Sequence, residues 1–149
     1  MAVLSFPPVV AVDPIPVRQA MKELSHLDEK GQARMVDVTA KTPTIRRAVA
    51  RGMVRMRPET AALIEEGGIP KGAVFATARR AVSMAAKKPG ELLPMCHPLE
   101  LTGIEIRFSC DAAAGEVAIE AKVTTVGRTG VEMEAMTAVG AAALTIYDM

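Results

Sequence analysis

Three carboxylates within the last twenty residues of this sequence could do acid–base chemistry. Glu132 and Glu134 stand near the start of an apolar stretch, and Asp148 stands at its end. Carboxylates transfer protons when burial and neighbouring charges shift their pKa values. Acids are also common in the first turn of a helix because the helix dipole favours negative charge there. On this stretch alone both interpretations stay open.

A lysine and a glycine that follow Pro70 form a second candidate. We expect a helix over 71–88, so Lys71 and Gly72 would lie at its N-terminus. Free backbone N–H groups, a glycine that admits close approach and a positive charge together suit a phosphate. The glycine spacing and the residue after Lys71 do not match a P-loop, so the pair alone is a weak signal.

Pro94 and Pro98 enclose Met95, Cys96 and His97, which we expect in a rigid, non-helical loop. One Cys and one His are too few ligands for zinc, so no metal is expected. Adjacent residues in an extended loop point opposite ways, which argues against a Cys96 nucleophile activated by His97. His97 could contact a ligand or transfer a proton, because imidazole titrates near neutral pH, but a structural histidine bonded to backbone fits equally well.

The composition implies that any anionic ligand is held by a local group of bases. There are 18 Lys and Arg against 17 Asp and Glu, a net charge of +1, so no global field attracts nucleic acid or an acidic membrane. Aromatic residues make up 3%, which disfavours base stacking. Two cysteines and no signal peptide are typical of a cytoplasmic protein. Lysine, histidine and carboxylate together suit rearrangement or elimination of a phosphorylated small molecule without metal or cofactor.

A final helix over 130–149 must position two of these groups. Thr129 can cap its first turn, and almost no charge precedes Asp148. A helix so poor in charge is normally buried. The positions expected to face the core are Ala135, Met136, Val139, Ala142, Ala143 and Ile146.

Alternation of apolar and polar residues predicts strands over 47–56, 101–108 and 116–126, the last two joined as a hairpin. Weaker alternation over 33–38 suggests a further strand. In the 47–56 strand we expect one solvated basic face, made by Arg47, Arg51 and Arg55.

The remaining elements are a short helix from Pro58 to Gly67 and the 71–88 helix, which Pro89 should end. This order of elements predicts an α+β fold, in which helices cover one face of an antiparallel sheet. The other face would need a partner chain or water.

Before residue 24, four prolines exclude helix from the first seventeen residues: Pro7, Pro8, Pro14 and Pro16. We expect an extended or mobile arm over 1–23, with at most two helical turns over 17–24. A single domain should then occupy 24–149.

Five segments together resemble the cyclic pyranopterin monophosphate synthase family, which carries out the second step of molybdenum-cofactor biosynthesis. The likeness runs from about Leu24 to the end of the sequence. The segments are Met35-Val36-Asp37-Val38 with Lys41; Lys71-Gly72 with Ala76-Thr77-Ala78-Arg79 and Ala85-Ala86-Lys87; Leu92-Leu93-Pro94-Met95-Cys96-His97-Pro98-Leu99; Thr129-Gly130-Val131-Glu132-Met133-Glu134-Ala135; and Ala143-Leu144-Thr145-Ile146-Tyr147-Asp148-Met149.

The resemblance implies a ferredoxin-like α+β fold and a homohexamer, a trimer of dimers with active sites at subunit interfaces. It implies a lyase that converts 3′,8-cyclo-7,8-dihydro-GTP to cyclic pyranopterin monophosphate and releases pyrophosphate. By matching position, Asp148 resembles the catalytic aspartate and Lys71 a catalytic or triphosphate-binding lysine. The residues that resemble substrate contacts, or stand beside them, are Met95, Cys96, His97, Glu132, Met133, Glu134 and, as a second base, Lys87.

The sequence departs from the family pattern in several places. Ala73 stands where members have Asp, residues 80–83 are bulkier and more basic, and the segment up to Met21 has no counterpart. Members continue past the position of Met149 with a lysine and a further strand, so we expect this chain to lack an edge strand and some bases. The alternative function is therefore a catalytically impaired or truncated member that acts only as an assembling or interaction protein.

Overall fold

A computed structural model describes residues 3–5, 30 and 32–149 of the chain. The helical turns expected over 17–24, and nearly all of the expected arm, lie outside the described residues. The elements are β1 (Val3–Ser5), β2 (Thr44–Arg55), α2 (Pro58–Glu65), α3 (Val74–Ala85), α4 (Pro89–Leu92), β3 (Leu101–Asp111), β4 (Glu116–Gly127) and α5 (Glu132–Asp148).

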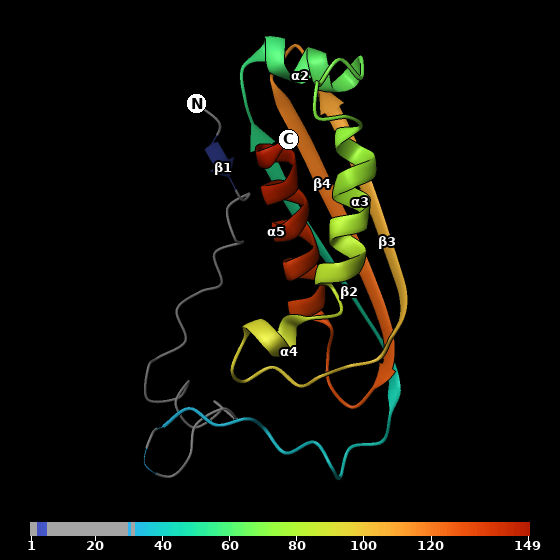
Figure 1. Cartoon of the computed structure of the whole chain (residues 1–149). Helices are drawn as coiled ribbons and strands as arrows, with labels where there is room; N and C mark the ends of the chain where they lie inside the picture. Colours follow the sequence, from blue (N-terminus) through green and yellow to red (C-terminus); the bar gives the residue numbers. More distant parts are fainter. Residues whose placement is uncertain (1–2, 6–29, 31) are drawn as a thin grey trace.

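The strands in the described part form one antiparallel sheet in the order β1-β2-β4-β3 (Figure 1). β2 pairs with β4 along its whole length, from Thr44 opposite Gly127 to Arg55 opposite Glu116. β3 and β4 form the expected hairpin, and α3 and α5 lie side by side across one face (Figure 1). The predicted fold class is confirmed: an α+β, ferredoxin-like antiparallel sheet with helices packed on one face.

The core lies between this face and the two long helices. The row of β4 that was expected to point inward is fully buried: Val117, Ile119, Ala121 and Val123. It belongs to the same core as the buried faces of α3 and α5, except that Val123 joins Val131 and Ala135 in a smaller cluster under the start of α5. Full burial of a valine or isoleucine side chain stabilises a fold by about 1.5–3 kcal/mol, so this row anchors both helices.

The opposite face of the sheet carries cross-strand ion pairs. Arg51 Nε lies 2.7 Å from Glu120 Oε2, and Arg55 Nε lies 2.8 Å from Glu116 Oε1. Lys122 on β4 pairs with Glu105 on β3, where its Nζ lies 2.7 Å from Glu105 Oε1. This ammonium lowers the pKa of the Glu105 carboxyl. Arg47, Arg51 and Arg55 of β2 thus lie on the outer face, as expected, and charges paired in this way suit contact with water.

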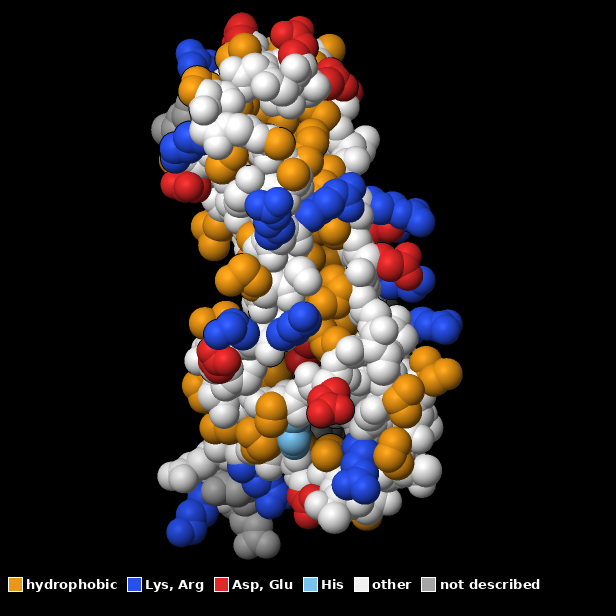
Figure 2. Space-filling view, turned by 45° about the vertical axis from the view of Figure 1, so that its right-hand side comes forward, with side chains coloured by type: hydrophobic (Ala, Val, Ile, Leu, Met, Phe, Trp, Pro, Cys, Tyr) orange, Lys and Arg blue, Asp and Glu red, His pale blue; other side chains and the backbone are white. Residues whose placement is uncertain are grey.

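A groove runs between α3 and the edge strand β3, where Figure 2 shows hydrophobic side chains flanked by Lys and Arg. The guanidinium of Arg79 bridges the two elements. Its Nη1 donates to the Ile106 carbonyl at 2.8 Å, and its Cζ lies 5.3 Å from the centre of the Phe108 ring. Arg79 therefore ties α3 to the open edge of the sheet.

Two predictions about the helices before β3 are wrong. α3 begins at Val74, so Lys71 and Gly72 lie in the turn before it rather than in its first turn. Gly72 has φ +105°, a conformation that does not continue into a right-handed helix. α3 ends at Ala85, and Pro89 opens the short helix α4, because proline is favoured at the first helical position.

Three further expectations are wrong at the two ends of the domain. Residues 33–38 are irregular apart from a single bridge at Ala33. The residue before α5 is Val131, and no side chain caps that helix, so Thr129 is not its cap. Met136 is 50% exposed, whereas Ala138 is buried in its place. No helix of the described part is long and apolar enough to cross a bilayer.

Candidate active site

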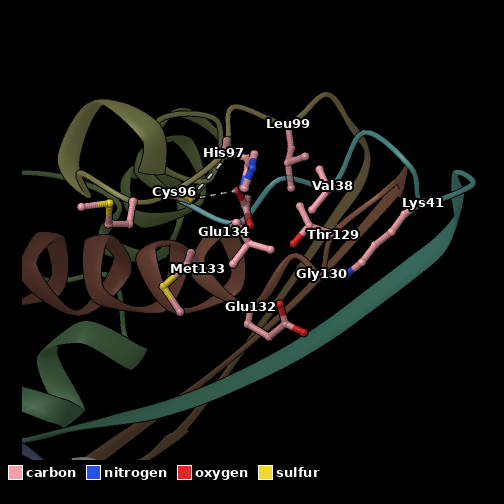
Figure 3. Close-up of a pocket in the computed structure, with 12 residues that line it drawn as sticks. Val38, Lys41, Cys96, His97, Leu99, Thr129, Gly130, Glu132, Met133 and Glu134 are labelled. Atoms are coloured by element: carbon pink, nitrogen blue, oxygen red, sulfur yellow. Dashed lines mark hydrogen bonds between the residues drawn. The ribbon is translucent and has the colours of Figure 1, made fainter. Parts of the chain in front are cut away.

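A pocket of about 270 Å³ lies at the N-terminal end of α5 (Figure 3). The irregular segment 36–41, the loop between α4 and β3, and the first turn of α5 meet there. Its walls are formed by Val36, Val38, Lys41, Met95, Cys96, His97, Leu99, Thr129, Gly130, Glu132, Met133 and Glu134. Every residue predicted to contact substrate, apart from Lys87, therefore borders one pocket.

The loop that carries Cys96 and His97 is held close to α4. The backbone N–H of Cys96 donates to the Leu93 carbonyl at 3.1 Å, and the flanking Pro94 and Pro98 fix their own φ angles. The Cys96 thiol contacts the carbonyl oxygen of His97 at 3.7 Å rather than its imidazole. The loop is non-helical, as expected, and it presents His97 to the pocket (Figure 3).

Glu134 is the buried carboxylate of this site, with 2% of its surface exposed. The Cys96 Sγ lies 4.0 Å from its Oε1, a weak hydrogen bond (Figure 3). Burial raises the pKa of Glu134, and the charge of Glu132 adds to the rise, although the backbone N–H of Glu134 opposes it. A carboxyl group in this state holds its proton to higher pH than an exposed glutamate, which suits acid–base chemistry.

The thiol of Cys96 is perturbed in the same direction. Burial is the larger cause of its raised pKa, and the nearby charge of Glu134 raises the pKa further. The thiolate is the nucleophilic form of cysteine, so this environment favours the inert thiol. The geometry and the electrostatics both argue against a cysteine nucleophile here.

Several residues of the pocket were not singled out individually by sequence reasoning. Val36 and Val38 line it, although their segment was expected to form a strand. Lys41 comes from the same segment, and its side chain extends toward the start of α5 (Figure 3). The signal that could have found Lys41 was its place in the first family-like segment. Leu99, Thr129 and Gly130 complete the set, and they too lie within such segments.

Arg46 on β2 carries a further buried polar group, outside the lining of this pocket. It is the cross-strand partner of Thr125, on the helix-covered side of the sheet. Among the described residues, its Nε is the buried side-chain nitrogen that has no hydrogen-bond partner. A buried N–H donor without a partner destabilises the folded protein, and a hydrogen bond to a bound anion or a water would remove that cost.

Lys87 lies beside the pocket rather than in its wall. It borders a second cavity of about 230 Å³ together with Lys88, whose Nζ lies 3.0 Å from Glu91 Oε2. His97, Leu99 and Glu134 line this cavity as well as the first. These three side chains therefore form a wall common to both cavities, and Lys87 lies on the far side of that wall.

Lys71 and Asp148 meet at the other end of α5. The Lys71 Nζ donates to the backbone carbonyl of Asp148 and lies 3.5 Å from its Oδ1. The side chains are 56% and 80% exposed, so the ion pair itself is worth only about 0–1 kcal/mol. A lysine on the last carbonyls of a helix also complements the helix dipole.

The two groups of predicted site residues are far apart within one chain. Glu134 and Asp148 both belong to α5, fourteen residues apart. At 1.5 Å per residue, α5 separates them by about 21 Å. The chain thus brings together the pocket residues, and separately Lys71 with Asp148, but it does not bring these two groups together.

No group of three or more His, Cys, Asp or Glu in the described part could hold a metal ion.

Comparisons with known proteins place these residues in a family. A protein of Roseiflexus sp. (strain RS-1) named cyclic pyranopterin monophosphate synthase is 61% identical over 129 residues, which are 87% of this chain and 82% of that protein. The protein of the same name from Pelotomaculum thermopropionicum is 62% identical over 129 residues, 87% of this chain and 76% of that protein. The one from Parvibaculum lavamentivorans is 53% identical over 130 residues, 87% of this chain and 81% of that protein. The family model of the MoaC family matches residues 35–149, and this chain belongs to the MoaC family.

Proposed function

We propose that this chain is a lyase that converts 3′,8-cyclo-7,8-dihydro-GTP to cyclic pyranopterin monophosphate and pyrophosphate in molybdenum-cofactor biosynthesis. The observation that carries the proposal is the pocket at the start of α5. Cys96, His97 and Glu134 border it together, and they stand in the most family-like segments of the sequence. The name shared by the relatives, at 53–62% identity, supports the same reaction.

Proton transfer within the pocket is assigned to Glu134 and His97. The buried carboxyl of Glu134 has a raised pKa, which brings it closer to the pH at which an acid or base is most effective. His97 lies in the same wall, and an imidazole nitrogen can donate or accept a proton. Met95, Met133 and Glu132 line the remaining surface and would contact the substrate.

The bases around the pocket would hold the triphosphate. Lys41 lines the pocket, and Lys87 lies beyond the common wall. Each hydrogen bond between a charged base and a phosphate in a site shielded from water is worth about 1.5–3 kcal/mol. A few such contacts are enough to hold a triphosphate in a protein whose net charge is only +1.

The proposal includes a second copy of the chain, because the catalytic role of Asp148 requires it. A substrate bound beside Glu134 cannot reach an aspartate about 21 Å away on the same helix. We infer that Lys71 and Asp148 of one protomer complete the pocket of another. The active protein is then at least a homodimer, with each site shared between two copies.

The exposed face of α5 supports such an arrangement. Met136 and Leu144 lie four residues before and after Gly140, and Met133 and Tyr147 lie seven before and after it. All four side chains are 38–68% exposed. An exposed apolar stripe of this kind marks an interaction surface. Two such helices packed antiparallel about Gly140 would set Asp148 of one copy beside Glu132 of the other.

The larger assembly is proposed as a cytoplasmic homohexamer, a trimer of such dimers. This last step rests on the family resemblance alone. Sedimentation equilibrium of the purified chain would test it, since dimers and hexamers differ threefold in mass. A monomer at micromolar concentration would contradict both the hexamer and the shared site.

The reaction is tested by incubating the purified chain with 3′,8-cyclo-7,8-dihydro-GTP and measuring cyclic pyranopterin monophosphate and pyrophosphate. We expect both products in equal amounts, and loss of both with Glu134→Gln. A chain that assembles but forms neither product would favour the alternative function, a member that acts only by assembly or interaction.

A mixing experiment tests the shared site. Asp148→Asn and Glu134→Gln proteins, each inactive alone, are unfolded together and refolded. In a mixed dimer one of the two sites contains both intact residues, so random pairing should restore about one quarter of the wild-type activity. The matched control is the double variant refolded with itself. If mixing restores no activity while mixed dimers form, each site belongs to a single chain.

A further inference from the structure

The loop that carries His97 joins the sheet at an irregularity. In the β3–β4 ladder Leu101 is opposite Thr125 and Gly103 is opposite Thr124, so Thr102 is an extra residue on β3. A bulge of this kind bends the strand and re-aims the chain that enters it. The chain that enters here is the pocket loop, whose last residues are His97, Pro98, Leu99 and Glu100.

Two threonine hydroxyls span the bulge in opposite directions. Thr125 Oγ1, on β4, donates to the carbonyl of Glu100. Thr102 Oγ1, on β3, donates to the carbonyl of Thr124 at 3.2 Å. Both bonds connect β4 with the β3 side of the hairpin. The exit of the loop is therefore fixed by side chains rather than by strand pairing alone.

Thr125 is unusual for its position. The inward row of β4 is apolar from Val117 to Val123, and Thr125 continues that row with a hydroxyl. It is 1% exposed, and only Glu134 is also polar and buried among the described residues. Burying a hydroxyl is unfavourable unless it is hydrogen-bonded. The carbonyl of Glu100 is the partner that satisfies it.

The path from Glu100 back to His97 is short and stiff. Pro98 has a fixed φ, and Leu99 packs against the cluster of Val123, Val131 and Ala135 under the start of α5. Leu99 and His97 both line the pocket. A shift of the Glu100 carbonyl would therefore be transmitted to the pocket wall instead of being absorbed by the loop.

We propose that Thr125 is a positioning residue, whose hydroxyl holds the end of the loop and so sets where His97 and Leu99 stand in the pocket. The substrate side of this inference rests on the proposed function. The structural side does not, because the position of His97 can be read without substrate.

The test compares Thr125→Val, which keeps the shape and removes the hydroxyl, with Thr125→Ser, which keeps the hydroxyl. The chain has two histidines, so imidazole NMR signals can be assigned with a His26→Gln variant. We expect Thr125→Val to shift the His97 signals and to lower kcat/KM on the order of tenfold, since small misplacements in a site are costly. Thr125→Ser should restore both values.

The matched control is Thr145→Val. Thr145 is partly buried, and its hydroxyl donates to the Ala141 carbonyl at 2.7 Å, but it lies within α5 away from the loop of its own chain. The control should leave the His97 signals in place. Unchanged signals in Thr125→Val, equal shifts in the control, or no restoration by Thr125→Ser would each overturn the proposal.

If Thr125→Val does not fold, Thr102→Val carries the test. Thr102 is exposed and provides the second hydroxyl across the same bulge. Its loss should shift the His97 signals less, and unchanged signals there would again overturn the proposal. A chain that shows these shifts but does not turn over the cyclised GTP would refute the proposed function and leave the role of Thr125 standing.

Discussion

The two ends of α5 hold their charged groups in opposite ways. At the N-terminal end, Glu134 is 2% exposed and is enclosed by the loop around Cys96 and His97. At the C-terminal end, the side chain of Asp148 is 80% exposed, and Lys71 reaches it from a turn. The environment of Glu134 is set by its own chain, whereas Asp148 is largely open to solvent. This difference is what a site shared between two copies requires, because the exposed end is free to enter a partner's pocket.

The largest effect should follow from changes at the exposed end. We expect Asp148→Asn and Lys71→Ala each to lower turnover of the cyclised GTP by about 10²–10⁴, the usual effect of losing an acid–base group. The free energy of unfolding should change by less than about 1 kcal/mol, because the pair is exposed. Steady-state kinetics and urea unfolding measure the two quantities.

The matched control for these variants is Glu66→Gln, an exposed acid after α2 and outside both groups. It should change neither turnover nor stability. If Asp148→Asn instead produced monomers, or Lys71→Ala lowered stability by several kcal/mol, the pair would serve to hold the fold rather than the reaction.

The next effect should be on assembly. Leu144→Lys places a charge on the apolar face of α5, where Leu144 is 68% exposed. We expect association to weaken by at least about tenfold, and turnover at low protein concentration to fall with it. The control is Leu63→Lys on α2, where the leucine is 46% exposed. Equal dissociation of both variants, or of neither, would remove α5 as the interface.

The sheet and the long helices were predictable because their burial repeats along the sequence. The inward row of β4 and the basic face of β2 follow simple alternation, and each agrees with the structure. Met136 was placed inward because it fits the apolar stripe, yet it is exposed. Periodicity alone cannot distinguish an apolar face that packs within the chain from one that packs on a partner.

The pocket was less predictable, since it depends on backbone without a repeating pattern. Lys71 was expected in a helix because Pro70 precedes it, but Gly72 adopts a positive φ and delays the helix to Val74. Val36 and Val38 line the pocket from a segment expected to be a strand. His97 and Glu134 are selected by residue type and again by the family-like motifs, whereas their proximity follows from tertiary packing of segments far apart in the sequence.

Glu134, at the enclosed end of α5, should make the stability of the protein depend on pH. The folded-state pKa of Glu134 is raised above its unfolded value, which is about 4.3 for a free glutamate. Protonation of Glu134 therefore makes its full contribution to the free energy of unfolding below the unfolded-state pKa. That contribution is lost as pH rises through the folded-state pKa. Glu134→Gln lacks this loss. Relative to the wild type it should therefore gain stability as pH rises from the unfolded-state pKa of Glu134 to its folded-state pKa.

Urea midpoints at several pH values measure this difference. Glu132→Gln is the matched control, since Glu132 is exposed in the same turn. It should reproduce at most the smaller part of the effect, because Glu132 contributes less than burial to the shift at Glu134. A constant difference between Glu134→Gln and wild type at all pH values would mean that Glu134 is not perturbed in solution.

The smallest expected effect concerns the reactivity of Cys96. Its pKa is raised mainly by burial and in smaller part by the charge of Glu134. Only the thiolate reacts with iodoacetamide, so Glu134→Gln should increase the alkylation rate at Cys96 slightly, without making it a reactive cysteine. Cys110 is an internal reference: its pKa is raised by burial, with Glu65 and Asp111 as the neighbouring charges, and Glu134 plays no part. Mass spectrometry of the two labelled peptides gives both rates in one sample.

A rise at Cys96 alone means that Glu134 is charged at the pH of labelling and that its charge raises the pKa of the thiol. Equal rises at both cysteines would instead indicate general loosening of the variant. No rise at either would mean that Glu134 is already protonated at that pH, or lies too far from the thiol to act on it; repeating the measurement above the folded-state pKa of Glu134 separates these two cases, because only the first then regains the difference.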